Sequence, residues 1–428
     1  MKVDGSLAGS SGGGTGGGAD SAGYTPGSGG RIGAGGALGS GGVTGADAPA
    51  PPDGPSFGAD AEVRPDDAAS DSAALTPGQF VATGDMKEAR ASHTATLLMT
   101  GKVLVVGGEA LQGGSRYSIN STELYDPGTG TFAASGTMYK SRVFHSATLL
   151  TSGSVLVVGG FYDGSALSTA EEYDPATGEF SRSVLNMTVA RQWHTAMLLP
   201  NGKVLIAGGQ FTQPASIERL SSAELFDPAT QSFSATGSMA VPRLQFTATL
   251  LRNGKVLVAG GINGTDNPAT SELYDPATGS FVATGTMITP RASHVATLLS
   301  DGRVLFAGGT ESYGLGNTPL ASAELYDPTT GLFTATGSMG SSRTQPSATL
   351  LPNGKVLVAG EDGIAGQTAE VYDPGSGTFS ITASMISQRG GHTATLLPDS
   401  RVLLAGGAFF STRAPGYIFL SSAELYSF

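Results

Sequence analysis

The sequence predicts an all-β repeat protein, and three observations lead to this prediction. Of the 428 residues, 65 are Gly, which argues against a mostly helical chain because Gly is a poor helix former. From residue 76 onward, apolar segments that end in Gly recur about every 50 residues. Each repeat contains four short segments with strand signals, separated by turns rich in Gly, Pro, Asn and Asp.

One repeat shows the four predicted strands in order. The first spans residues 294–299, and a turn at Asp301-Gly302 of a type typical of hairpins leads into the second, 304–308. The second strand is continuously apolar, as expected of an inner strand that is covered on both faces. The third, 323–326, and the fourth, 332–336, alternate more and are expected nearer to a solvated edge.

Three features of the repeat resemble the kelch family. They are the double Gly that closes the second strand, the Arg-x-x-His before the first, and a Tyr-Asp-Pro-x-Thr-Gly-x-Phe run, as in Tyr274 to Phe281. A bulky aromatic residue that is often Trp in that family is Phe here. The resemblance covers residues 76–428 and implies a β-propeller of four-stranded antiparallel blades around a central channel.

One Glu per third strand sets the number of blades at seven: Glu123, Glu171, Glu224, Glu272, Glu324, Glu370 and Glu424. The last of these repeats has no fourth strand before the chain stops. The missing strand is found at the other end, because residues 76–86 match residues 277–287 nearly position for position. We therefore predict a seven-bladed propeller in which the N-terminal strand completes the C-terminal blade and leaves no open edge.

One Arg precedes the first strand of every repeat: Arg90, Arg142, Arg191, Arg243, Arg291, Arg343 and Arg389. Arg and Glu in equal number favour a repeated structural ion pair, either between blades or anchoring a turn, because a guanidinium bridges carboxylates and carbonyls well. A carboxylate-binding cluster like that of sialidases would need a few special Arg residues instead.

All five His residues also fall in repeat positions, which favours strand capping over metal binding: His93, His145, His194, His294 and His392. Ligands spaced one per blade would be too far apart to converge on one ion, so no metal site is expected.

Residues 1–75 are rich in Gly, Ala, Ser, Pro and Asp, and we expect a disordered acidic linker before a propeller domain over 76–428. Three basic and nine acidic side chains fall in this segment, so it holds half of the net charge of -12. An acidic chain without a basic stripe is a poor match for nucleic acid, and no apolar run reaches membrane-spanning length. Such tethers resemble those of exported bacterial proteins, so we expect an extracellular or cell-surface monomer, with the cytoplasm as the alternative.

Function is expected where the repeats differ, in the connections between strands two and three and between strands four and one. These connections contain the aromatic residues, and one Arg, that could stack on a sugar or anchor a peptide. The candidate ligand-binding residues are Tyr117, Tyr162, Trp193, Phe211, Tyr313, Phe409, Phe410, Arg413 and Tyr417. Packing that merely holds the loops together is the alternative role for these side chains.

The sequence predicts a non-catalytic module that binds a protein or a glycan. No catalytic residue and no cofactor is expected. The best-known catalytic kelch relatives are copper radical oxidases that resemble galactose oxidase and use a Cys crosslinked to a Tyr, whereas this chain has no Cys. A glycan-modifying enzyme and a purely structural surface protein remain the alternatives.

Overall fold

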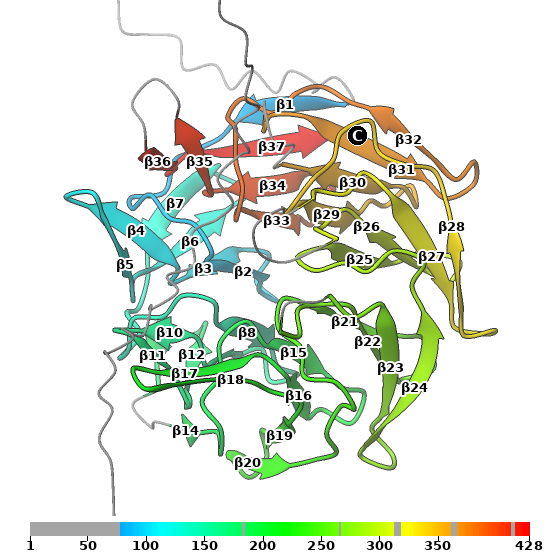
Figure 1. Cartoon of the computed structure of the whole chain (residues 1–428). Coiled ribbons are helices and arrows are strands. Elements are labelled where there is room, and N and C mark those ends of the chain that lie inside the picture. The colour runs from blue at the N-terminus through cyan, green and yellow to red at the C-terminus, as the bar shows by residue number, and fades with distance from the viewer. Residues whose placement is uncertain (1–77, 182–184, 265–266, 312–317, 361–365, 412–415) are drawn as a thin grey trace, which may run out of the picture. The chain divides into compact units, whose positions relative to one another are not determined.

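A computed structural model describes residues 78–181, 185–264, 267–311, 318–360, 366–411 and 416–428. Within these ranges the protein is all-β, with seven four-stranded antiparallel sheets set as blades around a common centre (Figure 1). The predicted fold class is thus confirmed. The linker predicted over residues 1–75 lies outside the described residues. No helix in the described part of the chain is long and apolar enough to cross a membrane.

The strands of blades 1 to 4 run from the inner strand to the outer one. They are β2 (Thr94–Leu97), β3 (Val103–Val106), β6 (Thr122–Asp126) and β7 (Thr131–Ala134) in blade 1; β8 (Ser146–Leu149), β9 (Val155–Val158), β12 (Thr169–Asp174) and β13 (Glu179–Phe180), with β14 (Leu185–Asn186) also on β12, in blade 2; β15 (Thr195–Leu198), β16 (Val204–Ala207), β19 (Ala223–Asp227) and β20 (Ser232–Ala235) in blade 3; and β21 (Thr247–Leu250), β22 (Val256–Ala259), β23 (Thr270–Asp275) and β24 (Ser280–Thr286) in blade 4.

Blades 5 to 7 follow the same order, and the last is built from both ends of the chain. They are β25 (Val295–Leu298), β26 (Val304–Ala307), β27 (Ala323–Asp327) and β28 (Leu332–Ala335); β29 (Ser347–Leu350), β30 (Val356–Ala359), β31 (Ala369–Asp373) and β32 (Thr378–Ile381); and β33 (Thr393–Leu396), β34 (Val402–Ala405), β37 (Ala423–Ser427) and β1 (Gln79–Ala82). β1 pairs antiparallel with β37 with Phe80 opposite Tyr426, which confirms the predicted closure.

The core lies between neighbouring blades rather than at the centre of the ring. Every second strand is buried along its whole length, and its Val, Leu, Ile, Phe and Ala side chains join clusters that cross from one blade to the next. One aromatic pair per blade joins strands three and four. In blade 7 that pair is Phe80 and Tyr426, with ring centroids 4.9 Å apart, as in Tyr274 and Phe281 of blade 4. The closing blade therefore has the same packing as the others.

The Gly that follows each second strand, the first of a double Gly in six of the seven blades, is required by close backbone approach. Gly260 has a φ of 67°, and a Cβ there would lie 2.3 Å from the carbonyl oxygen of Arg291. Only Gly fits such a position, because an L side chain would both strain the backbone and overlap the next blade.

Four of the connections between strands two and three fold into small hairpins, which the sequence did not predict. The hairpins are β4 (Glu109–Gln112) with β5 (Ser115–Ser118), β10 (Phe161–Tyr162) with β11 (Ser165–Ala166), β17 (Gln210–Gln213) with β18 (Ser216–Arg219), and β35 (Ala408–Ser411) with β36 (Gly416–Phe419). They belong to blades 1, 2, 3 and 7, which are consecutive around the ring (Figure 1). In blades 4 and 5, the described residues of these connections form only isolated bridges.

Isolated bridges place both kinds of variable connection on one face. Ala91, just before the first strand of blade 1, bridges Glu109, just after its second strand, and Gln192 bridges Gln210 in the same way. We call this side the loop face. The opposite side carries the turns between strands one and two and between strands three and four, and we call it the turn face.

Candidate binding site on the loop face

Beneath the loop face, each of the seven repeat Arg residues forms an ion pair with the repeat Glu of the same blade. The N–O distances are 2.9 Å for Arg90–Glu123, 2.6 Å for Arg142–Glu171, 2.9 Å for Arg191–Glu224, 3.2 Å for Arg243–Glu272, 2.8 Å for Arg291–Glu324, 2.8 Å for Arg343–Glu370 and 2.6 Å for Arg389–Glu424. The side chains of the seven Arg are at most 1 % exposed. A ligand on the loop face therefore cannot reach them.

Each of these ion pairs fastens the incoming connection to the blade that follows it. In blade 3, Nη1 of Arg191 donates to the carbonyl oxygens of Gly208 and Ser222, while Glu224 accepts from the backbone N–H of Thr188 at 2.7 Å. Burial lowers the pKa of Arg191, and Glu224 raises it again in part. The guanidinium of Arg191 thus bonds to the carbonyl of Gly208, which is the first residue of the double Gly in this blade.

In five blades, a His residue just before the inner strand bonds to the inner strand of the preceding blade. Nε2 of each lies 2.8 to 3.0 Å from a Thr or Ser hydroxyl in the pairs His93–Thr393, His145–Thr94, His194–Ser146, His294–Thr247 and His392–Ser347. Burial lowers the pKa of His145, His194, His294 and His392 to about 3. Among the described residues, no three His, Asp or Glu side chains are grouped so as to hold a metal ion.

Above the His residues, seven residues surround the mouth of the channel, one from each blade. We call them the mouth ring: Ser92, Phe144, Trp193, Gln245, Ser293, Gln345 and Gly391. The backbone N–H of Ser92 donates to the carbonyl of Gly391 at 2.9 Å. In the same way, the backbone N–H of Trp193 donates to the carbonyl of Phe144 at 3.1 Å. The backbone N–H of Gln245 donates to the carbonyl of Trp193, and that of Ser293 to the carbonyl of Gln245. Seven segments at a spacing of ~5 Å enclose a ring on the order of 10 Å across.

Six of the seven mouth-ring residues have a left-handed backbone. The φ angles are 54° for Ser92, 58° for Phe144, 52° for Trp193, 53° for Gln245, 53° for Ser293 and 61° for Gly391. Gly adopts this region freely, whereas each of the other five pays a conformational cost of about 1–2 kcal/mol. Strain of this kind is concentrated at functional sites in proteins.

The mouth ring is aromatic on one side and polar on the other. The rings of Phe144 and Trp193 are 4.6 Å apart at their centroids, and Trp193 packs on the buried side chains of Leu244 and Ile262. In the next two blades, the Ser293 hydroxyl donates to Oε1 of Gln245 at 2.8 Å. The stack and the hydrogen bond hold both sets of side chains in place at the mouth.

The hairpins carry several of the aromatic residues that the sequence singled out. Tyr117, Tyr162 and Phe410 are exposed, whereas Phe211 and Phe409 are half-buried. Tyr313 and Arg413 lie outside the described residues. Leu111, Ile217 and Ile418 add to the exposed apolar surface of the same four hairpins. A row of exposed apolar side chains on adjacent raised elements is typical of a recognition surface.

Two candidate residues that the sequence did not indicate lie where the first and last blades meet. The guanidinium of Arg116, on β5, lies 4.2 Å from the ring centroid of Tyr417 on β36 and 3.3 Å from the carboxylate of Glu109. Burial raises the pKa of Glu109, while its contacts with Arg116 and Ser92 lower it in part. Tyr417 is therefore half-buried against Arg116, and Glu109 connects this cluster to the mouth ring.

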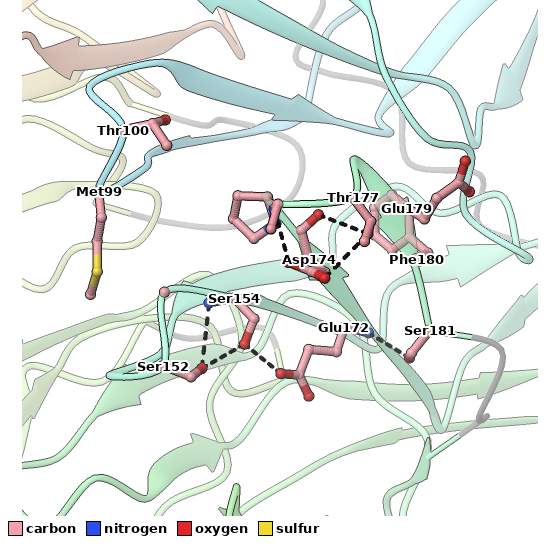
Figure 2. Close-up of a pocket in the computed structure, with 13 residues that line it drawn as sticks. Met99, Thr100, Ser152, Ser154, Glu172, Asp174, Thr177, Glu179, Phe180 and Ser181 are labelled. Atoms are coloured by element: carbon pink, nitrogen blue, oxygen red, sulfur yellow. Dashed lines mark hydrogen bonds between the residues drawn. The ribbon is translucent and has the colours of Figure 1, made fainter.

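A depression of about 700 Å³ lies on the turn face of blade 2, far from these residues in the fold (Figure 2). It is lined by Met99, Ser154, Glu172, Asp174 and Phe180, among others. Ser154 stands where the other blades have Lys or Arg, and Glu172 where they have Leu or Val. Both carboxylate oxygens of Glu172 already accept hydrogen bonds, from Ser154 and from Gln231 of blade 3. These interactions account for the departure from the repeat.

Known proteins share parts of this sequence and fold. The kelch motif matches residues 144–183. A fungal alcohol oxidase, described as having catalytic diversity among the AA5 family and in complex with copper, is similar with a TM-score of 0.61 and 19% identity over 82% of this chain and 76% of that one. The structure of YjhT is similar with a TM-score of 0.54 and 13% identity over 70% of this chain and 99% of that one. The sequence matches none of the curated proteins. The kelch motif thus matches residues of one repeat out of seven, and the two structures share the propeller fold of this chain.

Proposed function

We propose that this protein is a non-catalytic binding module that recognises a protein or a glycan through the loop face. One observation carries the proposal: the four hairpins of blades 7, 1, 2 and 3 expose apolar side chains beside the mouth ring, whereas the ion pairs beneath repeat without change. A rigid scaffold with variable connections on one face is the usual arrangement of a recognition surface. An extracellular or cell-surface location would suit a glycan or surface-protein ligand.

The test is an array of glycans and purified surface proteins probed with the full chain. The double variant Tyr117→Ser with Phe410→Ser should weaken binding of the best ligand at least about tenfold, because each exposed aromatic side chain contributes about 1 kcal/mol or more to a recognition surface. Ile381→Ser, which removes an apolar side chain 79% exposed on the outer strand β32, is the matched control and should leave binding unchanged. Equal effects of the two changes would exclude the loop face as the site. Binding to nothing on the array would favour a purely structural protein.

One observation favours the alternative of a glycan-modifying enzyme. Glu109 is a partly buried carboxyl with a raised pKa beside the mouth ring, and a carboxyl of that kind can act as a general acid. Copper radical chemistry like that of the resembling oxidases is not part of this alternative, since the chain has no Cys. Product formation from an arrayed glycan that disappears in Glu109→Gln would establish the enzyme.

A further inference from the structure

We infer that the group entering the channel mouth is a neutral sugar residue. This inference rests on the proposed function and narrows it, because it selects one of the two ligand classes and places its terminal unit at the mouth ring. The loop hairpins would contact the rest of the same ligand.

The chemical composition of the mouth ring supports a neutral polyhydroxylated ligand. None of the seven side chains is ionisable: two are aromatic, two are amides, two are hydroxyls, and one residue is Gly. The apolar face of a sugar ring stacks on aromatic side chains, and its hydroxyl groups need partners that both donate and accept. Amides and hydroxyls supply both functions on one side chain.

The arrangement of these side chains matches the two kinds of surface that a sugar presents. Phe144 and Trp193, in adjacent blades, form the aromatic side, and Leu244 and Ile262 support the Trp193 ring from below. Gln245 and Ser293 follow in the next two blades, and their mutual hydrogen bond fixes the amide. A ligand seated between the two sides would meet a stacking surface and a hydrogen-bonding surface at once.

The backbone of the mouth ring argues that these side chains have a use. Blade 7 shows that Gly fits the position, since Gly391 has the same left-handed φ and the same backbone hydrogen bond to its neighbour. At Phe144 and Trp193 the chain instead keeps bulky residues that are costly in this conformation. The backbone conformation alone would favour Gly at all six left-handed positions.

A charged ligand is a poorer match for the same place. Glu109, which hydrogen-bonds to Ser92 of the mouth ring, lies 3.3 Å from Arg116 and pairs with it, and the repeat Arg and Glu residues beneath the ring pair with each other. An acidic or basic group of a peptide would therefore lose its hydration at the mouth without gaining a counter-charge there. A peptide-bound protein ligand is the outcome that would overturn the inference.

The single Trp of the chain makes the test direct, because fluorescence reports on Trp193 alone. The full chain is titrated with methyl glycosides and trisaccharides of glucose, galactose, mannose and N-acetylglucosamine, and with glucuronic acid and glucosamine as charged analogues. At least one neutral compound should change the emission with a Kd below about 1 mM. The matching charged analogue should bind at least about tenfold more weakly.

Calorimetry on variants then assigns the site. Trp193→Gly, which copies blade 7, should weaken the neutral sugar about tenfold or more, whereas Trp193→Phe should retain most of the affinity. Ile381→Ser, on the outer strand β32, should leave the affinity for a monosaccharide glycoside unchanged. No binding of any neutral sugar, or unchanged affinity in Trp193→Gly, overturns the inference. If a protein ligand binds through the hairpins while neutral sugars do not, the inference fails and the proposed function stands; if nothing binds, both fail.

Discussion

The ion-pair layer and the mouth ring lie next to each other in every blade, yet one is uniform and the other is not. The same Arg and Glu occur in all seven blades, at most a few per cent exposed, with the same backbone partners. The mouth-ring residue of each blade lies two positions after its repeat Arg. From blade 1 to blade 7 these residues are Ser, Phe, Trp, Gln, Ser, Gln and Gly. The difference separates what holds the ring together from what the ring can present.

The largest expected effect comes from removing β1, the strand with which the N-terminal end completes blade 7. A chain shortened to begin at residue 88 lacks β1, so β37 loses its only outer neighbour and Phe80 leaves the core of blade 7. We expect such a protein to melt far below one that begins at residue 74 and to aggregate through the exposed edge. Equal melting temperatures in differential scanning calorimetry would show that closure does not stabilise the ring.

The next largest effect is expected from acidification, because the buried His residues of five blades are uncharged in the folded ring. Their folded-state pKa, about 3 for His194 and three others, lies below the ordinary value of 6.5. The unfolded chain therefore binds more protons between these values, so the free energy of unfolding is highest above pH 6.5 and falls by several kcal/mol as the pH decreases toward 3. Urea unfolding at pH 7 and at pH 4 measures this fall, and a midpoint that does not change would contradict it.

A single broken ion pair should have a smaller but still large effect. Arg191→Ala leaves Glu224 buried without its counter-charge, and we expect a loss of about 3–5 kcal/mol in the free energy of unfolding. The double variant Arg191→Met with Glu224→Leu should recover part of that loss, because no unpaired charge remains. The matched control is Lys255→Ala, which breaks the exposed pair with Asp275 and should hardly change the unfolding midpoint. A comparable loss in the control would remove the distinction between the two kinds of pair.

Periodicity explains how much of this could be predicted. The number of blades, the closure by the N-terminal strand, and the seven Arg and seven Glu residues recur at one spacing, so each repeat supports the interpretation of the others. Beyond the Arg, the partners of the Glu residues could not be predicted, because most of their hydrogen bonds come from backbone N–H groups such as that of Thr188. Backbone contacts of this kind leave no trace in residue types.

The candidate site was harder to predict because its features occur once each. Trp193 was indicated by its aromatic type, but the left-handed conformation of Gln245 and Ser293 carries no sequence signal, since neither is Gly or Asn. Arg116, which pairs with Glu109 in its own hairpin, becomes a neighbour of Tyr417 only when blades 1 and 7 meet. Each mouth-ring residue directly precedes the repeat position that His occupies in five blades. Because this residue is Gly391 in blade 7, an alignment of the seven repeats at that place would have indicated a left-handed backbone there.

The seam in blade 7 has a consequence for how the order of the blades is encoded. β1 and β37 meet in the same antiparallel register, and with the same aromatic pair, as strands three and four of an unbroken blade. The folded ring therefore has no structural beginning, and a circular permutant with its termini in another turn should close in the same way. What the chain order determines is which blades are neighbours, and hence that the four hairpins stand side by side along one arc of the mouth.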